Sequence, residues 1–394
     1  IFSRQRYWGE PIPMYYKNGL PVPLSQDHLP LVLPKVENYL PTADGAPPLG
    51  NATHWAWDTK SEKVVANDLI DNKTIFALEM NTMPGWAGSS WYFYRYMDAQ
   101  NDTAFVSKEA ANYWQDVDLY LGGSEHATGH LLYSRFWQKF LFDLGHLPVD
   151  EYAKKLINQG MILGSSAFMY RKKGTQEYLS KGLIEGQEVE PIRVDIALVN
   201  LSDELDCEAV KQWQPQFADA SFVLEEGVYK VGREVEKMSK SKYNVVNPDQ
   251  ICEDYGADTL RMYEMFLGPI EQAKPWNTAG ISGVHSFLKK TWRLYHNEET
   301  FYVSDDAPSA ESLKSLHQTI KKVTKDIEHF SFNTCISAFM ICVNELTAQK
   351  CNQRAVLEPL AILLSPFASH ITEELWALLG HKESISQVAY PVFE

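Results

Sequence analysis

The segment Lys237-Met238-Ser239-Lys240-Ser241 places two ammonium groups and two hydroxyls within five positions. Two lysines three residues apart can both reach one polyphosphate, and the serines add hydrogen-bond donors. Such charges offset the negative charge that develops on phosphate oxygens during a transfer reaction, which depends mostly on positioning and electrostatics. A Lys/Ser run is also typical of a solvated loop. The segment therefore predicts phosphate chemistry only in combination with its neighbours.

A second group of candidate residues follows a strand-like run. Residues 117–121 alternate in polarity, the run breaks at Gly122-Gly123, and residues 131–141 are expected to continue as a buried helix. A strand, a glycine pair and a helix start allow a flat base or a phosphate to approach backbone amides. This order of elements predicts a nucleotide-binding edge.

The most aromatic stretch is 82–96, and it contains Trp86, Trp91 and Tyr92. Aromatic residues at helical spacing more often form a core than a binding site. The small residues 88–90 precede them, however, and would let a small ligand approach the backbone. Both interpretations are open at this point.

A metal site is not predicted. His126 and His130 are four residues apart and share a helix face, and Glu125 lies beside them. A zinc-protease motif needs its glutamate directly after the first histidine and also a third ligand. The five cysteines form no CxxC pair, which favours reduced thiols over disulfides or a cysteine-rich zinc site.

The C-terminal third of the chain is expected to be helical. Apolar residues repeat at intervals of three and four between Leu313 and Phe330, which predicts an amphipathic helix. Asn333 is expected to cap the next helix, and Pro359 and Pro366 are expected to interrupt the pattern that follows. Residues 371–379 form the last clear helix. A helical bundle is the general expectation.

The charge is unevenly distributed. The 394 residues carry a net charge of −15, with 45% hydrophobic residues. Residues 176–232 hold twelve Asp/Glu and four Lys/Arg, a net charge of −8, so the remainder is only mildly acidic. Local basic spots occur at 171–173, 289–293 and 321–325, and they leave RNA binding through phosphate contacts possible. No apolar run is long enough to span a bilayer.

Several long motifs resemble the leucyl-tRNA synthetases, which are class I aminoacyl-tRNA synthetases. The lysine-containing loop resembles their KMSKS loop. Residues 120–136 resemble a stretch in which the isoleucyl and valyl enzymes differ. The remaining matching segments are 3–13, 82–96, 158–161, 255–261, 332–336 and 366–376.

The resemblance implies site residues and substrates. Lys237 and Lys240 are expected to be catalytic, with ATP as substrate and Mg²⁺ bound with it. The expected ATP-binding residues are Gly122, Gly123, Glu125, Gln159, Gly160, Met161, Lys237, Met238, Ser239, Lys240 and Ser241. The expected leucine-binding residues are Trp86, Ser89, Tyr92, Tyr120, His126 and His130. Gly88 departs from the family, because relatives often carry an acidic residue there.

The implied fold is α/β followed by all-α. Residues 1–175 are expected to form the second half of a Rossmann-like catalytic domain, and residues 176–232 a small acidic inserted module. Residues 233–275 would carry the KMSKS loop and a connecting segment, and residues 276–394 a helical anticodon-binding domain. The implied partners are tRNA(Leu), leucine and ATP, in a cytoplasmic and monomeric protein that does not contact a membrane.

Two expected parts of such an enzyme are not found in this sequence: a HIGH-type tetrapeptide and a threonine-rich editing domain before Ser3. The chain is therefore expected to be part of a longer enzyme and to have little activity alone. An isoleucyl- or valyl-type synthetase is the nearest alternative. A different nucleotidyltransferase with a similar loop, or a non-catalytic RNA-binding paralogue, are the alternatives from other classes.

Overall fold

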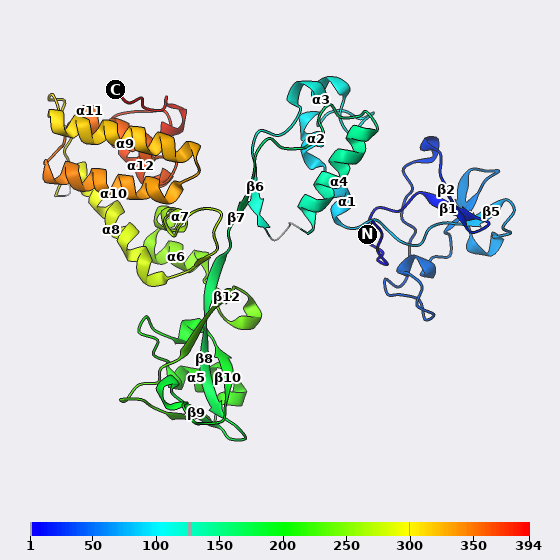
Figure 1. Cartoon of the computed structure of the whole chain (residues 1–394), viewed down its shortest axis with the longest axis horizontal. Coiled ribbons are helices and arrows are strands. Elements are labelled where there is room, and N and C mark those ends of the chain that lie inside the picture. Colours follow the sequence, from blue (N-terminus) through cyan, green and yellow to red (C-terminus); the bar gives the residue numbers. More distant parts are fainter. Residues whose placement is uncertain (1, 125–127, 299) are drawn as a thin grey trace. The chain divides into compact units, whose positions relative to one another are not determined.

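The structure of the chain is a computed structural model that describes residues 2–124, 128–298 and 300–394. Its contacts divide the chain into two compact units, Ile1–Asn158 and Gln159–Glu394, and each is described by itself (Figure 1). No helix in the described ranges is long and apolar enough to cross a bilayer.

The first half of unit 1 is built from short strands. β1 (Met14–Lys17) and β2 (Leu20–Pro23) form a hairpin whose two-residue loop, Asn18-Gly19, has positive φ at both positions. This is the sequence that a type I′ turn requires. β3 (Ala56–Asp58) pairs with β4 (Lys63–Val65) and with β5 (Ile75–Ala77). A small core supports these strands; its fully buried or nearly buried members include Leu49, Trp55 and Leu78.

The second half of unit 1 carries most of the helices. They are α1 (Trp86–Ser89), α2 (Tyr92–Met97), α3 (Lys108–Trp114) and α4 (His130–Asp143). β6 (Tyr120–Gly123) pairs with β7 (Leu156–Gln159). The core beneath these elements is aromatic and includes Phe93, Tyr94 and Tyr152.

Two sequence-based expectations need correction here. The strand begins at Tyr120 and contains the glycine pair, instead of spanning 117–121 and ending before it. Helix α4 is not fully buried, because Leu132, Phe136 and Phe140 are about half exposed while Tyr133 and Gln138 are buried. Its apolar residues continue around the helix, so composition alone did not distinguish the two faces.

Unit 2 begins with a sheet organised by one long strand, β8 (Ile162–Lys172). β10 (Val189–Val194) and β12 (Gly232–Lys237) pair with it antiparallel, and the short β13 (Lys274–Pro275) pairs with it in parallel. β9 (Glu177–Leu179) pairs with β8 and β11 (Ser221–Val223), and α5 (Cys207–Trp213) lies near β10 (Figure 1). The core beside this sheet is a cluster of buried residues that includes Ala167 and Val231.

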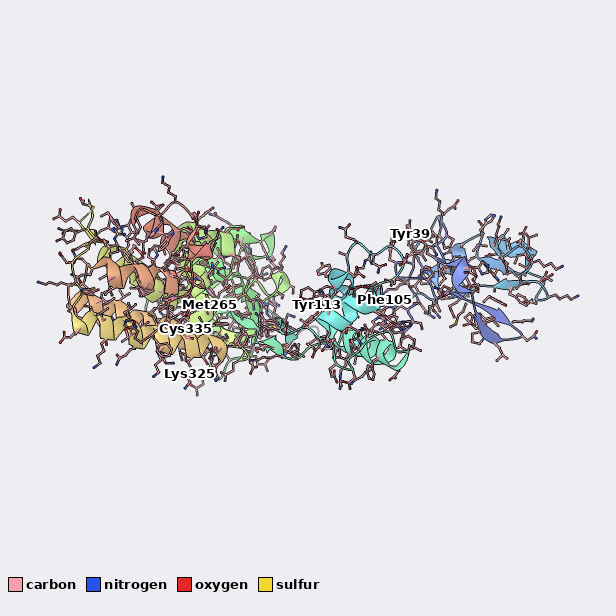
Figure 2. The ribbon with its side chains drawn as sticks, turned by 90° about the horizontal axis from the view of Figure 1, so that it is seen from above. Tyr39, Phe105, Tyr113, Met265, Lys325 and Cys335 are labelled. Atoms are coloured by element: carbon pink, nitrogen blue, oxygen red, sulfur yellow. The ribbon has the colours of Figure 1, made fainter. Side chains whose placement is uncertain are left out.

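The rest of unit 2 is helical. The helices are α6 (Pro248–Tyr255), α7 (Ala257–Phe266), α8 (Thr278–Leu294), α9 (Ala310–Glu328), α10 (Phe332–Ala348), α11 (Arg354–Leu364) and α12 (Ser369–Leu378). A two-residue hairpin, β14 (His296–Asn297) with β15 (Thr300–Phe301), joins α8 to the bundle. Figure 2 labels Cys335 in the bundle, where it is fully buried, and Lys325, which is exposed. The five cysteines are free thiols.

The amphipathic pattern predicted α9 well, but two details were wrong. Asn333 lies inside α10, whose N-cap is Ser331. Pro359 does not interrupt the helical pattern, since α11 continues through it. A proline inside a helix costs about 3 kcal/mol. Burial of Val356, Leu357, Leu360 and the other apolar residues of α11 offsets this cost, because each contributes about 1.5–3 kcal/mol.

Helix α7 is fastened to α12 by one buried carboxylate. Asp258 accepts hydrogen bonds from the backbone amides of His370 (3.2 Å) and Ile371 (2.7 Å) at the start of α12, and from His370 Nδ1 (2.9 Å). Arg261, one turn later, donates to the carbonyl of Pro366 at 3.2 Å. The segment that follows the lysine loop in sequence is thus joined directly to the bundle.

Candidate functional site

Unit 1 contains a cavity of about 600 Å³ where α1, α2, β6 and α4 meet. Seven residues that the sequence predicted as site residues line it: Trp86, Ser89, Tyr92, Tyr120, Gly122, Gly123 and His130. The other lining residues are Phe93, Val117, Leu119, Leu121 and Leu131. The wall is therefore mostly aromatic and aliphatic, with hydroxyl and imidazole groups as its polar atoms. Such a cavity suits a small apolar side chain.

A hydrogen-bonded chain of three side chains crosses this cavity. The Tyr120 hydroxyl lies 2.5 Å from His130 Nε2 and 2.9 Å from the Tyr92 hydroxyl. Ser134, buried one turn along α4, donates to the His130 carbonyl at 2.8 Å, and its hydroxyl lies 3.3 Å from Nε2. Burial raises the pKa of Tyr120, and the neighbouring Tyr92 raises it further, so its hydroxyl stays protonated at neutral pH.

Ring contacts fix the histidine in this chain. The His130 ring stacks on Tyr92 at a centroid distance of 5.8 Å and on Tyr120 at 6.0 Å, and Trp86 meets it edge-on at 6.1 Å. Rings held in this way have few alternative rotamers.

Glycine allows the tryptophan to approach the helix start. His130 is the first residue of α4, and Gly129 precedes it as the N-cap. A Cβ atom at Gly129 would lie 3.0 Å from Trp86 Nε1, closer than side chains normally pack. Trp137 Nε1, two turns along α4, donates to the carbonyl of Ala87 at 2.8 Å and joins α1 to the same helix.

The space above Gly88 is occupied by a carboxylate from a distant part of the sequence. A Cβ atom at Gly88 would lie 2.0 Å from Glu10 Oε1. Gly88 was identified from the sequence as a departure from an acidic residue, but no role was predicted for Glu10. A negative group therefore lies close to this position, supplied by the segment that opens the chain. No local pattern in the sequence indicated this contact, because the two residues are far apart along the chain.

Glu125 and His126, which the sequence assigned to the ATP and leucine sites, lie outside the described residues. Within the ranges that are described, no group of three His, Cys, Asp or Glu side chains is arranged to hold a metal ion.

In unit 2, two predicted segments meet at one end of β8. Gln159-Gly160-Met161 leads into β8, and Lys237, the last residue of β12, is paired with Leu163. Gly160 is held by a hydrogen bond from its amide to the Ile270 carbonyl (2.8 Å), and a Cβ atom there would lie 2.0 Å from Gln272 O. Only glycine fits so close to a neighbouring backbone.

The two lysines of the loop are exposed, and the residues between them are held by contacts with the rest of unit 2. Lys237 and Lys240 are exposed, whereas Met238 packs against the helical core. The Ser239 amide donates to Asn244 Oδ1 at 2.8 Å, and the hydroxyls of Ser239 and Ser241 are 3.1 Å apart. Asn244 is fully buried. Its anchoring role was not predicted from the sequence, since nothing in the local pattern shows that this asparagine is buried.

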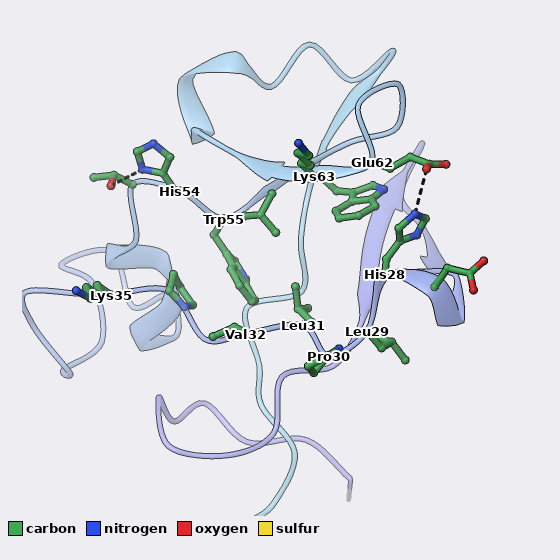
Figure 3. A pocket seen from close by; sticks show the side chains of 15 residues that line it. His28, Leu29, Pro30, Leu31, Val32, Lys35, His54, Trp55, Glu62 and Lys63 are labelled. Atoms are coloured by element: carbon green, nitrogen blue, oxygen red, sulfur yellow. Dashed lines mark hydrogen bonds and ion pairs between the residues drawn. The ribbon is translucent and has the colours of Figure 1, made fainter. Parts of the chain in front are cut away.

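A second cavity, of about 660 Å³, lies among the short strands of unit 1 (Figure 3). His28 and Glu62 form an ion pair across part of it at 3.2 Å. His54 lines the other side, where its Nδ1 lies 3.1 Å from Thr53 Oγ1. None of the residues predicted from the motifs lines this cavity. The volume of this cavity is therefore no reason to place the reaction in it.

The matching family models and the relatives described below are all tRNA ligases or synthetases. The family described as the anticodon-binding domain of tRNA ligase matches residues 310–394, and the family of class I tRNA synthetases (I, L, M and V) matches residues 221–276. A leucine–tRNA ligase of Christiangramia forsetii is 64% identical over 419 residues, covering 100% of this chain and 44% of that protein. One from Flavobacterium johnsoniae is 67% identical over 395 residues, covering 100% and 41%.

Among solved structures, the ternary complex of the Agrobacterium radiobacter K84 LeuRS with tRNA and LeuAMS matches with a TM-score of 0.65 at 27% identity. The match covers 100% of this chain and 42% of that one. The α/β part followed by a helical bundle is therefore the arrangement of a class I synthetase. The chain spans about two-fifths of the length of the relatives that it matches.

Proposed function

Because this chain belongs to the leucine–tRNA ligase family over its whole length, we propose that it serves, within a longer enzyme, in the ATP-dependent attachment of leucine to tRNA(Leu). The observation that carries the proposal is the cavity of unit 1, in which seven residues expected from the family motifs line one apolar space. Its aromatic and aliphatic wall suits the isobutyl side chain of leucine. Such walls separate similar aliphatic side chains by only about 10–200-fold.

The reaction has two steps. A carboxylate oxygen of leucine attacks the α-phosphate of ATP; a new bond to that phosphorus forms, the bond to the β-phosphate bridge breaks, and pyrophosphate leaves. A hydroxyl of the terminal ribose of the tRNA then attacks the carbonyl of leucyl-adenylate and displaces AMP. Lys237 and Lys240 stabilise the charge on the departing pyrophosphate. Mg²⁺ enters with ATP and supplies further charge neutralisation.

A basic cavity in the helical part supports an RNA partner. It has a volume of about 750 Å³ and lies beside α8, the β14–β15 hairpin and the end of α10. Among the residues of the described ranges that line it there is no Asp or Glu; they are Ser286, Lys290, Arg293, Leu294, His296, Asn297, Tyr302, Thr347, Lys350, Cys351 and Asn352. Cations and amides without competing carboxylates suit the phosphates of an RNA backbone.

We further propose that the enzyme acts in the cytoplasm as a monomer.

The test is amino-acid-dependent ATP–pyrophosphate exchange by a full-length enzyme that contains this segment, assayed with leucine, isoleucine, valine and methionine. We expect exchange with leucine alone, and its loss in Lys240→Ala. Preferential exchange with isoleucine or valine would reassign the specificity. Absence of exchange with all four amino acids, in a protein that still binds tRNA, would favour a non-catalytic RNA-binding paralogue.

A further inference from the structure

Glu236 directly precedes the lysine loop, and its carboxylate has partners on three separate segments. It accepts from Ser166 Oγ of β8 at 2.5 Å. It accepts from Arg193 Nη2 of β10 at 3.1 and 3.3 Å, and from Lys242 Nζ, just after the loop, at 2.5 Å. One carboxylate thus joins the strand before the loop, the residue after it and a strand of the module at 176–232.

Both ends of the loop also meet at Ser166. The buried Asn244, three residues after the loop, donates from Nδ2 to Ser166 Oγ at 3.0 Å and to the Lys237 carbonyl at 3.3 Å. Ser166 therefore accepts from Asn244 while it donates to Glu236. Removal of the carboxylate would leave this buried hydroxyl without an acceptor, which is costly in a site that excludes water.

The module makes a second contact with the end of the loop. Tyr243 has φ 54° and ψ 32°, and its carbonyl accepts from the Ile196 amide at 3.0 Å. Its ring meets Trp213 of α5 edge-on at a centroid distance of 4.8 Å. Arg193, Ile196 and Trp213 all lie within residues 176–232, so the module contacts the residues that flank the loop on both sides.

The two loop lysines do not hold the loop themselves. Lys237 and Lys240 make no side-chain hydrogen bond or ion pair with the described residues. Their positions consequently depend on the neighbours that fix the backbone. A misplacement of about 1 Å in a catalytic group can reduce the rate by about 100-fold.

We propose that Glu236 is a positioning residue through which Arg193 of the 176–232 module sets the placement of the Lys237–Ser241 loop on the triphosphate. This inference rests on the proposed function for its chemistry and on the hydrogen bonds of Glu236 and Asn244 for its geometry. Lys242, then Ser166 and Arg193, lower the pKa of Glu236 to about 2, so the carboxylate remains charged at every pH at which the enzyme would work. The acidic module thereby contributes to the active site without touching ATP.

A matched pair of controls separates this role from a merely structural one. Arg233, on the same strand, also fastens β12 to the module, through Asp203 at 2.9 Å, without contacting the loop. Glu234, also on β12, is exposed and makes no hydrogen bond or ion pair with the described residues. If Arg193 only attached β12 to the module, Arg233→Ala would lower kcat as much as Arg193→Ala does.

The first measurement is the kcat and the KM values for leucine and ATP in ATP–pyrophosphate exchange by the full-length enzyme. We expect Glu236→Ala to lower kcat by about 10–100-fold and to change the leucine KM less than about twofold. Arg193→Ala should lower kcat several-fold, Arg193→Lys should restore part of it, and the double variant should match Glu236→Ala alone because the two act in series. Arg233→Ala and Glu234→Ala should stay within about twofold of the wild type.

The second measurement is hydrogen exchange on the full-length enzyme without substrates, which needs no activity. Arg193→Ala should speed exchange at the amides of Ser239, Lys242 and Tyr243 and leave the β8–β10 amides unchanged. Unaltered exchange at these three amides would overturn the tether whatever the activity. Equal losses of kcat in Arg193→Ala and Arg233→Ala, or a parallel rise of the leucine KM, would overturn the positioning role. An inactive wild type would instead overturn the proposed function.

Discussion

At the residue scale, the Tyr120 hydroxyl connects two other polar side chains of the unit 1 cavity, His130 and Tyr92. In Tyr120→Phe, both lose this partner while the ring remains. A lost hydrogen bond in a half-buried site costs about 0.5–1.5 kcal/mol, which corresponds to about 2–10-fold in affinity. We expect the leucine KM of the full-length enzyme to rise by that factor. The raised pKa of Tyr120 keeps its hydroxyl protonated at neutral pH, as this hydrogen bond requires.

The control for this prediction is Tyr96→Phe. Tyr96 lies on the same helix as Tyr92 and contacts its ring, but it is 76% exposed and does not line the cavity. Its KM should equal that of the wild type. A KM that rises equally in both variants would assign the effect to the packing of α2.

A surface carboxylate of unit 1 gives a prediction about pH. Arg135 and Lys139 lower the pKa of Glu151 to about 2. Since the pKa is lower in the folded state, the stabilisation is complete above the ordinary value near 4.5 and is lost as the pH falls toward 2. The pair is largely exposed, so its contribution is below about 1 kcal/mol. The difference in melting temperature between wild type and Glu151→Gln should be constant from pH 7 to 5 and should shrink below pH 4.5. A difference that grows on acidification would contradict the ion pair.

At the element scale, the attachment of α7 to α12 depends on Asp258. Its carboxylate is buried and accepts both first-turn amides of α12, as an N-cap residue does. Removal of such a partner costs about 1–3 kcal/mol. In Asp258→Ala, the amides of His370 and Ile371 should exchange with solvent about 5–100-fold faster. The exposed Asp254, on α6, is the control, and its alanine variant should leave these amides unchanged. Equal exchange in both variants would show that packing alone holds α12.

The elements that the sequence predicted are those with a strong local signal. The three- and four-residue spacing from Leu313 to Phe330 predicted α9, and the motifs named seven of the residues that line the unit 1 cavity. Pro359 and the exposed face of α4 were misjudged because each depends on which neighbours cover the helix. Glu10 above Gly88 and Glu236 beside Arg193 were not found, since they join residues 78 and 43 positions apart. Local patterns do not report interactions at such separations.

At the scale of the whole molecule, the net charge is −15, but the basic residues differ in whether they pair with carboxylates. At the end of β8, Arg171, Lys172 and Lys173 each pair with a glutamate. On α9, Lys322 pairs with Asp326, whereas Lys321 lies over the Phe393 ring and Lys325 forms no ion pair with the described residues. Around the cavity beside α8, by contrast, Lys290 donates to the neutral Asn344, and Arg293 and Lys350 form no ion pair with the described residues. Cations without acidic partners cost least to transfer to phosphates.

We therefore expect RNA binding to depend on this one basic cavity and not on the basic residues as a class. The double variant Arg293→Ala/Lys350→Ala of the full-length enzyme should bind tRNA(Leu) more weakly. The slope of log affinity against log salt should fall by about one for each phosphate that no longer meets a cation. The matched variant Lys172→Ala/Lys173→Ala removes the same charge from paired positions and should leave the slope unchanged. Equal weakening by both would mean that the enzyme attracts RNA through its overall charge, because a specific site loses affinity only where its own cations are removed.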